Sequence, residues 1–221
     1  MKTTAVFALC FICFSYSLAI SSVDDVYEYL WEKNKDIAIK TLDVDFLRQM
    51  ENGSLQAERY VNFTIQDINY LLKVTKMLKK MSAKVSQPEL RDFMNKRYSS
   101  YKSFADYMLK QYFFKGEPSI QQTPAMEKYL SFYKKLTAGD PLYFAVGLLP
   151  CARLWLWLAN NLKIPPTNAY YNWRMENVNG HPEKHYKALL NTYLNTPEKV
   201  IKANTVFRTQ MQHEHDFFFT S

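Results

Sequence analysis

The sequence predicts an all-α protein that folds as a single domain, and three observations support this prediction. The chain has 221 residues, 48% of them hydrophobic, which is enough for one sizeable core and short for two. Its 5 glycines and 9 prolines are too few for a turn-rich all-β fold. Beyond the N-terminus the apolar residues recur at helical spacing, and alternation typical of a strand never persists.

Residues 1–20 are predicted to be a secretory signal peptide. Lys2 supplies a positive charge, residues 5–14 form an apolar run, and Ala19 marks the small residues expected before a cleavage site. The alternative, an uncleaved anchor helix, needs about 20 apolar residues, and this run is shorter. We therefore expect a secreted domain over residues 21–221, with no further segment long and apolar enough to span a membrane.

Secretion would leave a single cysteine in the mature chain. Cys10 and Cys13 would be removed with the signal peptide, so only Cys151 would remain. No disulfide could then form within the chain, and Cys151 would be buried and inert, paired with another chain, or reactive. The triplets that begin at Asn52 and Asn62 match the pattern of N-glycosylation sites, as expected for a secreted protein.

The first clear helix is predicted over about residues 58–81, after a turn at residues 52–54. Later helices are predicted to begin at Pro88, Pro141 and Pro197, because proline is favoured at the first helical position.

The ends of these later helices also have signals. Asp140 and Thr196 can cap a helix by accepting hydrogen bonds from the free amides of its first turn. Pro165 and Pro166 end the helix that begins at Pro141. A short helix that carries Tyr170 follows them.

Two carboxylates fall on apolar helix faces. Asp67 shares its face with Tyr70, and Glu214 shares its face with Phe217. A carboxylate buried in this way must be paired, hydrogen-bonded or protonated, because burying a bare charge is too costly. Each acid taken alone is more often a structural partner than a catalyst, so a functional reading requires several such groups to converge.

A thiol and aromatic residues supply the other chemistry. Cys151 follows Pro150 inside the apolar run of residues 142–162, and the proline is expected to kink this helix. Tyr170 and Trp173 share a face of the next short helix. We expect one pocket that contains both acids, the thiol and these rings, which suits a flat heteroaromatic ligand and nucleophilic chemistry.

Four elements of the sequence, in order, resemble motifs of the thiaminase II (TenA) family. Residues 46–71 resemble its F-x6-G-[ST]-L and Q-D-x-x-Y-L segment, and residues 139–151 resemble its G-x9-L-P-C element. Residues 170–173 resemble Y-x-x-W, and residues 214–218 resemble the terminal E-x-x-F-W. The resemblance extends over nearly all of the mature chain. It implies a haem-oxygenase-like helical bundle without haem and the hydrolysis of thiamin or a related aminopyrimidine.

The resemblance also implies roles for individual residues. Cys151 corresponds to the nucleophile, and Asp67 corresponds to the acid that contacts the exocyclic amine and a ring nitrogen of the pyrimidine. Glu214 corresponds to a group that donates and accepts protons. The substrate-binding wall corresponds to Tyr70, Tyr170, Phe217 and, four residues after the cysteine, Trp155.

This sequence departs from the family pattern at four places. Trp155 stands where a tyrosine is usual, and Lys128 aligns with a pocket tyrosine, with Tyr129 one residue away. Residues 44–45 replace a His-Pro pair, and Phe218 replaces a tryptophan. The retained thiol and acids favour a secreted hydrolase. The changes at positions 155 and 128 favour the alternative, a non-catalytic secreted protein that binds another planar ligand in the same pocket.

We expect a small pyrimidine or thiamin-like ligand and no metal, cofactor or nucleic-acid partner. His181 and His185 have helical zinc spacing but lack a third ligand. The lysines of residues 73–84 are interpreted as a solvated face, because no nucleic-acid motif accompanies them. The resemblance further implies a homo-oligomer, either a tetramer or a dimer.

Overall fold

The computed structural model describes residues 23–221, which form α-helices joined by short connections and contain no strand. The predicted signal peptide, with Cys10 and Cys13, lies outside the described residues. The helices are α1 (Val26–Glu32), α2 (Lys35–Leu42), α3 (Asp45–Asn52), α4 (Ala57–Lys84), α5 (Pro88–Gln111), α6 (Pro124–Ala138), α7 (Pro141–Asn161), α8 (Tyr171–Asn177), α9 (Pro182–Tyr193) and α10 (Pro197–Thr220).

The start signals in the sequence are confirmed. Pro88, Pro141 and Pro197 each occupy the first turn of a helix, and Pro124 and Pro182 do the same for α6 and α9. The missing N–H of proline costs nothing there, because the first amides of a helix have no partner within it. The predicted helix over residues 58–81 is α4, which is longer by one residue at its start and three at its end.

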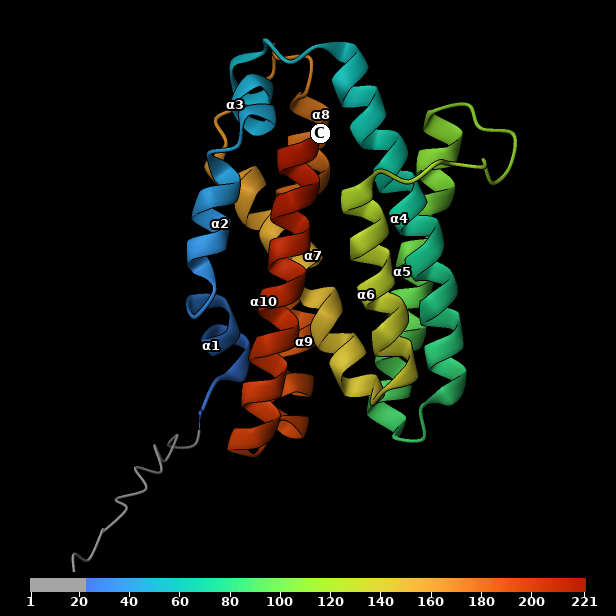
Figure 1. Cartoon of the computed structure of the whole chain (residues 1–221), viewed down its shortest axis with the longest axis vertical. Helices are drawn as coiled ribbons and strands as arrows, with labels where there is room; N and C mark the ends of the chain where they lie inside the picture. The colour runs from blue at the N-terminus through green and yellow to red at the C-terminus, as the bar shows by residue number, and fades with distance from the viewer. Residues whose placement is uncertain (1–22) are drawn as a thin grey trace, which may run out of the picture.

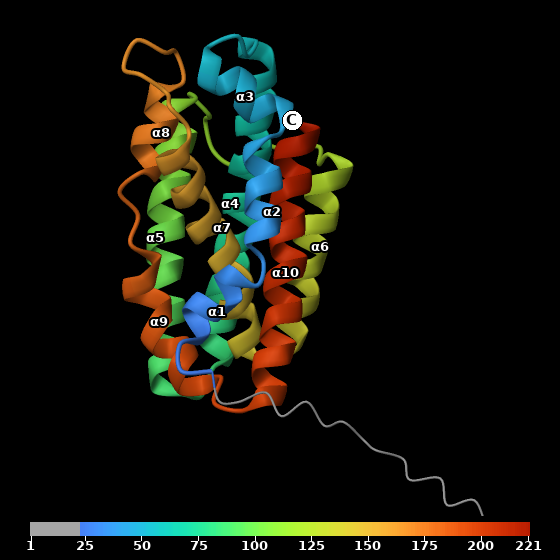
Figure 2. The ribbon, with the colours of Figure 1, turned by 90° about the vertical axis from the view of Figure 1, so that its left-hand side faces the viewer.

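The long helices form a bundle around α7 and α10. In Figure 1, α10 lies between the short helices α1 and α2 on one side and α6 on the other, with α4 and α5 beyond α6. Figure 2 shows α5, α8 and α9 together on the opposite side of α7 from α10. The most extensive helix pairs are α4 with α5 and α7 with α10. Segments far apart in the sequence therefore meet around the middle of α7.

Helix α7 corrects one expectation from the sequence. By length and composition it is apolar enough to span a membrane, so the prediction that no segment beyond residue 20 meets that test is wrong. In the bundle, 72% of its apolar stretch is buried inside the protein. The helix is hydrophobic on all sides because neighbouring helices pack around most of its circumference, as they do around a central core helix.

The lysine run on α4 has two specific contacts. The ammonium of Lys84 donates to the carbonyl oxygens of Thr137 and Gly139, at 3.1 and 3.0 Å, at the end of α6. A cation is favourable there because the C-terminal carbonyls of a helix carry partial negative charge. Lys76 pairs with Glu117 at 2.6 Å, on the surface. The run therefore contributes to the packing of α4 on α6 as well as to solvation.

The cap of α7 provides a test of how this central helix begins. The carboxylate of Asp140 accepts a hydrogen bond from the amide of Leu142 at 2.9 Å. Asp140→Ala should lower the free energy of unfolding by about 1 kcal/mol, because it removes an N-cap. Asp140→Asn should remain close to the parent, since asparagine caps as well. Urea unfolding of the three proteins measures this, and equal midpoints for Ala and Asn would contradict the capping role.

Candidate active site

Two of the three predicted catalytic side chains face one cavity. A cavity of about 360 Å³ is lined by Asp67 of α4 and by Cys151 and Trp155 of α7, with residues of α5, α8 and α9 completing its wall. Asp67 is only 8% exposed. Cys151 is partly exposed, and no other cysteine lies in the part of the chain that the structure describes. The bundle thus brings the predicted nucleophile and the predicted pyrimidine-binding acid to the same wall.

Glu214, the third of these residues, is held behind that wall. Its side chain is almost fully buried, with 1% exposed, and it does not line the cavity. The hydroxyl of Tyr129 donates to Oε1 of Glu214, and the indole Nε1 of Trp155 donates to Oε2 at 2.9 Å. Both oxygens of a buried carboxylate therefore have a donor, as burial of such a group requires.

These contacts explain two departures from the family pattern. Trp155 lacks the tyrosine hydroxyl, but its indole N–H supplies a donor to Glu214 instead. Tyr129 is 1% exposed and supplies the second donor, so the tyrosine that contacts the acid is one residue later than the alignment indicated. Lys128 has no place in this site. Both donors to the acid are thus supplied by Tyr129 and Trp155.

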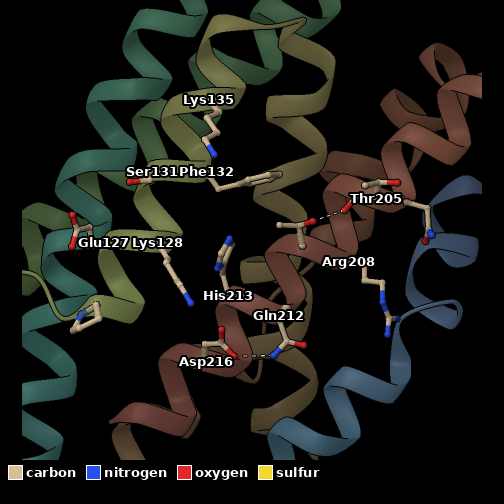
Figure 3. Close-up of a pocket in the computed structure, with 13 residues that line it drawn as sticks. Glu127, Lys128, Ser131, Phe132, Lys135, Thr205, Arg208, Gln212, His213 and Asp216 are labelled. Atoms are coloured by element: carbon tan, nitrogen blue, oxygen red, sulfur yellow. Dashed lines mark hydrogen bonds between the residues drawn. The ribbon is translucent and has the colours of Figure 1, made fainter.

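Lys128 instead faces a larger hollow on the outer surface between α6 and α10. Figure 3 shows Lys128 and Lys135 of α6 reaching into this hollow opposite His213 and Arg208 of α10. The hollow measures about 740 Å³. None of the predicted catalytic or substrate-binding residues lines it, although the ring of His213 stacks against Tyr129 with centroids 5.6 Å apart. We therefore place the candidate site at the cavity of about 360 Å³ that Asp67, Cys151 and Trp155 line.

Burial strongly perturbs the two acids. Removal from water raises the pKa of Asp67 to about 8, and the negative charges of Glu214 and Glu176 act in the same direction. Removal from water also raises the pKa of Glu214, to about 7, although hydrogen bonds from Trp155, Tyr129 and Cys151 oppose the rise. Near neutral pH, Asp67 is mainly protonated and Glu214 is close to its midpoint. A group at its midpoint is well suited to accept and return a proton.

The thiol is also perturbed. Burial raises the pKa of Cys151 well above its usual value, and the charges of Glu214 and Asp67 raise it further. The hydroxyls of Tyr70 and Tyr101 act in the opposite direction by favouring the thiolate. Cys151 is thus a neutral thiol in the resting protein. It can act as a nucleophile only if a base takes its proton during attack.

A cluster of buried tyrosines lies beside the thiol. The hydroxyl of Tyr133 donates to the carbonyl of Gly147 at 2.9 Å, and the hydroxyls of Tyr70 and Tyr133 are 2.9 Å apart. Because Tyr133 has used its only proton, Tyr70 is the donor between the two in the resting protein, and it can favour a thiolate only by turning that proton from Tyr133 to the sulfur. The accepting carbonyl belongs to α7, four residues before Cys151. The tyrosines therefore tie α4 and α6 to the backbone of α7 that leads to Cys151.

Three of the predicted wall residues lie behind the cavity surface. Tyr70, Tyr170 and Phe217 are all buried. They line neither the cavity of about 360 Å³ nor a smaller cavity of about 180 Å³ that adjoins it. The hydroxyl of Tyr170 donates to the carbonyl of Leu55, and the ring of Phe217 stacks on Phe63 at 4.8 Å. These side chains therefore support the residues that line the cavities from behind and do not face the cavities themselves.

A second, smaller cavity of about 180 Å³ adjoins the first. Asp67, Trp155, Phe104, Asn177 and Glu176 line both cavities. Glu176 was not predicted from the sequence, although a signal was present. Glu176 follows Trp173 by three residues, so the two share a face of α8. Tyr101 was missed as well.

Other predicted sites lie on the surface or lack partners for a metal. Asn52 and Asn62 are exposed and thus accessible to glycosylation, which remains a prediction for either residue. Over residues 23–221, no three His, Cys, Asp or Glu side chains are grouped to hold a metal ion. His181 instead contacts Glu183 at 3.2 Å.

Comparison with known proteins agrees with the fold. No family model matches the chain, and no protein of curated function matches it in sequence. Among solved structures, a TenA homologue from P. horikoshii OT3 is similar, with 20% identity, a TM-score of 0.69, and coverage of 88% of this chain and 96% of that one. A TenA homologue from Pyrococcus furiosus has 16% identity, a TM-score of 0.73 and coverage of 87% and 98%.

A third similar structure, described as a TenA family transcription regulator from Silicibacter sp. TM1040, has 14% identity, a TM-score of 0.75 and coverage of 88% and 95%. The prediction of a haem-oxygenase-like, TenA-like all-α bundle is thereby confirmed. At these identities the comparison establishes the fold and leaves the activity to the chemistry of the site.

The raised pKa of Glu214 predicts a pH-dependent stability difference. Its folded-state pKa of about 7 lies above the ordinary value of 4.5, so the folded state binds this proton more tightly than the unfolded chain. The resulting stabilisation is complete below about pH 4.5 and is lost as pH rises through about 7. Glu214→Gln has no such proton, so its stability relative to the parent should increase over this interval, by at most about 1.4 kcal/mol per pH unit. Denaturant unfolding at several pH values measures the difference, and a constant difference would contradict the perturbed pKa.

Proposed function

We propose that the protein is a thiaminase II-like hydrolase that cleaves thiamin or a related aminopyrimidine, with Cys151 as the nucleophile. The observation that carries this proposal is the placement of Cys151 and Asp67 on one cavity, with Glu214 close enough to raise the pKa of the thiol. A thiol, a proton-exchanging acid and a hydrogen-bonding acid are the groups that this chemistry requires. The TenA-like fold supports the proposal by analogy.

Asp67 is suited to recognise an aminopyrimidine. With its pKa raised to about 8, the carboxyl is mainly neutral at pH 7 and offers one O–H donor and one carbonyl acceptor. An aminopyrimidine presents a ring nitrogen, which accepts, beside an exocyclic amine, which donates. The two groups can form a pair of parallel hydrogen bonds without burying a net charge. Trp155, which lines the same cavity, offers an aromatic surface for the ring.

Cys151 and Glu214 would then act together. The ionised Glu214 takes the thiol proton as sulfur adds to a carbon of the electron-poor ring. Addition makes the ring nitrogens more basic, and the acids can supply protons to them as charge develops. The bond between the methylene carbon on the pyrimidine and the nitrogen of the leaving group then breaks, and its electron pair goes to that nitrogen. Water adds to the methylene carbon and supplies the hydroxyl group of the product. Elimination of Cys151 restores the aromatic ring, and the sulfur takes back its proton from Glu214.

A second candidate is a non-catalytic protein that binds a planar heteroaromatic ligand. The neutral, strongly perturbed thiol favours this reading, because no histidine is among the groups that favour its thiolate. Both candidates require the same pocket and differ only in turnover.

We also propose that the protein is secreted after cleavage near residue 20, because residues 1–20 have the composition of a signal peptide. Mass spectrometry of the N-terminus of protein from the culture medium should show a start near that residue. Full-length protein retained in the cytosol would contradict secretion.

Turnover by Cys151 variants distinguishes the two candidates. Purified parent protein should release a thiazole and a hydroxymethylpyrimidine from thiamin, detected by mass spectrometry. Cys151→Ser should retain binding of the aminopyrimidine product and lose turnover by 100-fold or more, on the order of the contribution of an essential group, because serine is a far weaker nucleophile without a dedicated base. Turnover by the serine variant at the parental rate would eliminate the nucleophile role. A parent that binds but never turns over would favour the binding protein.

Asp67 variants test the neutral hydrogen-bonding pair. Asp67→Leu should weaken binding of the aminopyrimidine by about 1–3 kcal/mol, since it leaves polar groups of the ligand unpaired. Asp67→Asn, which keeps one donor and one acceptor, should bind nearly as well as the parent at pH 7. The affinity of the parent should fall above about pH 8, where Asp67 ionises, whereas that of the Asn variant should not. Calorimetry measures all three, and an Asn variant as weak as Leu would show that the ionised acid is the binding form.

A further inference from the structure

Arg97 of α5 is a cation in the wall of the candidate site that the protein itself leaves without a partner. It lines the cavity of about 360 Å³ together with Asp67 and Cys151. Its guanidinium forms no hydrogen bond or ion pair with any of residues 23–221, and its Nε is buried without an acceptor. Every other arginine of the chain donates to a side-chain oxygen or a backbone carbonyl. Because an unpaired buried N–H is costly, the structure favours a ligand that brings an acceptor to Arg97.

The packing of α5 against α9 places Arg97 at this wall. The two helices lie next to each other (Figure 2), and the ring of Phe93 on α5 packs edge-on against Tyr186 of α9, with centroids 5.0 Å apart. Both rings are buried. Arg97 follows Phe93 by four residues and therefore shares its face of α5. The aromatic contact thus holds the base of the arginine side chain beside α9.

The part of the cavity wall that α9 supplies is also positive. The N-terminal end of α9 borders the cavity through Gly180, His181 and Pro182, and the N-terminus of a helix carries partial positive charge. The side chain of His181 does not cap this end and contacts Glu183 at 3.2 Å instead.

The pKa of His185, which lines the cavity from α9 as well, reports the charge around it. Burial lowers this pKa, and the positive charges of Arg97, Lys96 and Lys184 lower it further. The charge of Glu183 acts in the opposite direction. Cations thus outnumber acids around His185, and a negatively charged group is favoured beside it.

The two acids of the same cavity do not neutralise Arg97. Asp67 and Glu176 both line the cavity, but neither forms an ion pair with the guanidinium, and Arg97 is not among the groups that shift the pKa of either acid. Asp67, with its pKa raised to about 8, is mainly neutral at pH 7. The cavity therefore has a neutral end at Asp67 and a positive end at Arg97 and α9.

We propose that Arg97 and the N-terminal end of α9 form a subsite for a carboxylate, so that the ligand joins an aminopyrimidine ring at Asp67 to a substituent that ends in a carboxylate. The position of the ring rests on the proposed function, whereas the subsite itself does not depend on turnover. The planar fork of an arginine matches the two oxygens of a carboxylate. A carboxylate carries one negative charge, which balances the one unpaired guanidinium in the cavity wall.

An arginine that serves a ligand can be replaced without loss of stability. Arg97→Gln breaks no hydrogen bond or ion pair within residues 23–221 and removes a buried unpaired N–H. Its midpoint of thermal unfolding, measured without ligand, should therefore equal that of the parent or exceed it. A marked fall in the midpoint would show that Arg97 supports the fold, and would contradict the subsite.

A binding experiment tests the subsite directly. The probes are aminopyrimidines that carry a carboxylate on none, one or two methylene groups, each compared with its neutral carboxamide by calorimetry. The parent should bind at least one carboxylate tenfold or more tightly than the matching amide. Arg97→Gln should reduce this preference to less than threefold. Lys102→Gln, which removes an exposed cation of α5 that pairs with Asp106 and lines neither cavity, should keep the parental preference.

The outcomes separate this inference from the proposed function. Binding of the carboxamides reports on the ring site, whereas the difference between carboxylate and carboxamide reports on Arg97 alone. A parent without this difference, or an Arg97→Gln variant that retains it, would overturn the subsite whether or not thiamin is hydrolysed. A difference that depends on Arg97 in a protein without turnover would support the subsite and contradict the hydrolase. Inorganic phosphate that binds through Arg97 more tightly than every carboxylate probe would overturn the choice of a carboxylate.

Discussion

Burial of the Glu214 carboxylate is the constraint on which the rest of the site depends. Glu214 comes from α10, and its two oxygens accept hydrogen bonds from Tyr129 of α6 and Trp155 of α7. A buried carboxylate that loses one of its donors is costly, so the relative rotation of these three helices is fixed within narrow limits. The same arrangement sets the orientation of the Trp155 indole, and that ring forms part of the wall beside Cys151.

The core around this carboxylate favours neutral forms of ionisable groups. Asp67, Glu214 and Cys151 all have raised pKa values, and burial is the largest cause for each. A site of this kind binds uncharged, flat ligands without a large desolvation cost. The raised pKa of Glu214 makes its carboxylate a stronger base towards the thiol, whereas the raised pKa of Cys151 opposes the transfer of its proton.

Trp155 has two roles at this site. Its indole N–H donates to Glu214 and so helps to hold the buried carboxylate. The indole also lines both cavities, where it contributes aromatic surface to each. Trp155 can therefore hold the Glu214 carboxylate and shape the wall of both cavities at the same time.

The sequence by itself determined the class of fold and the starts of the long helices, because proline and capping residues act through the local backbone. It also identified Asp67, Cys151 and Glu214 as polar groups on apolar faces. Only the tertiary structure decided that Tyr129, and not Lys128, contacts the acid, that Tyr170 and Phe217 lie behind the wall, and that Glu176 faces both cavities. These outcomes depend on how each helix is rotated against its neighbours, and a shift of one residue on a helix turns a side chain by about 100°, from core to surface.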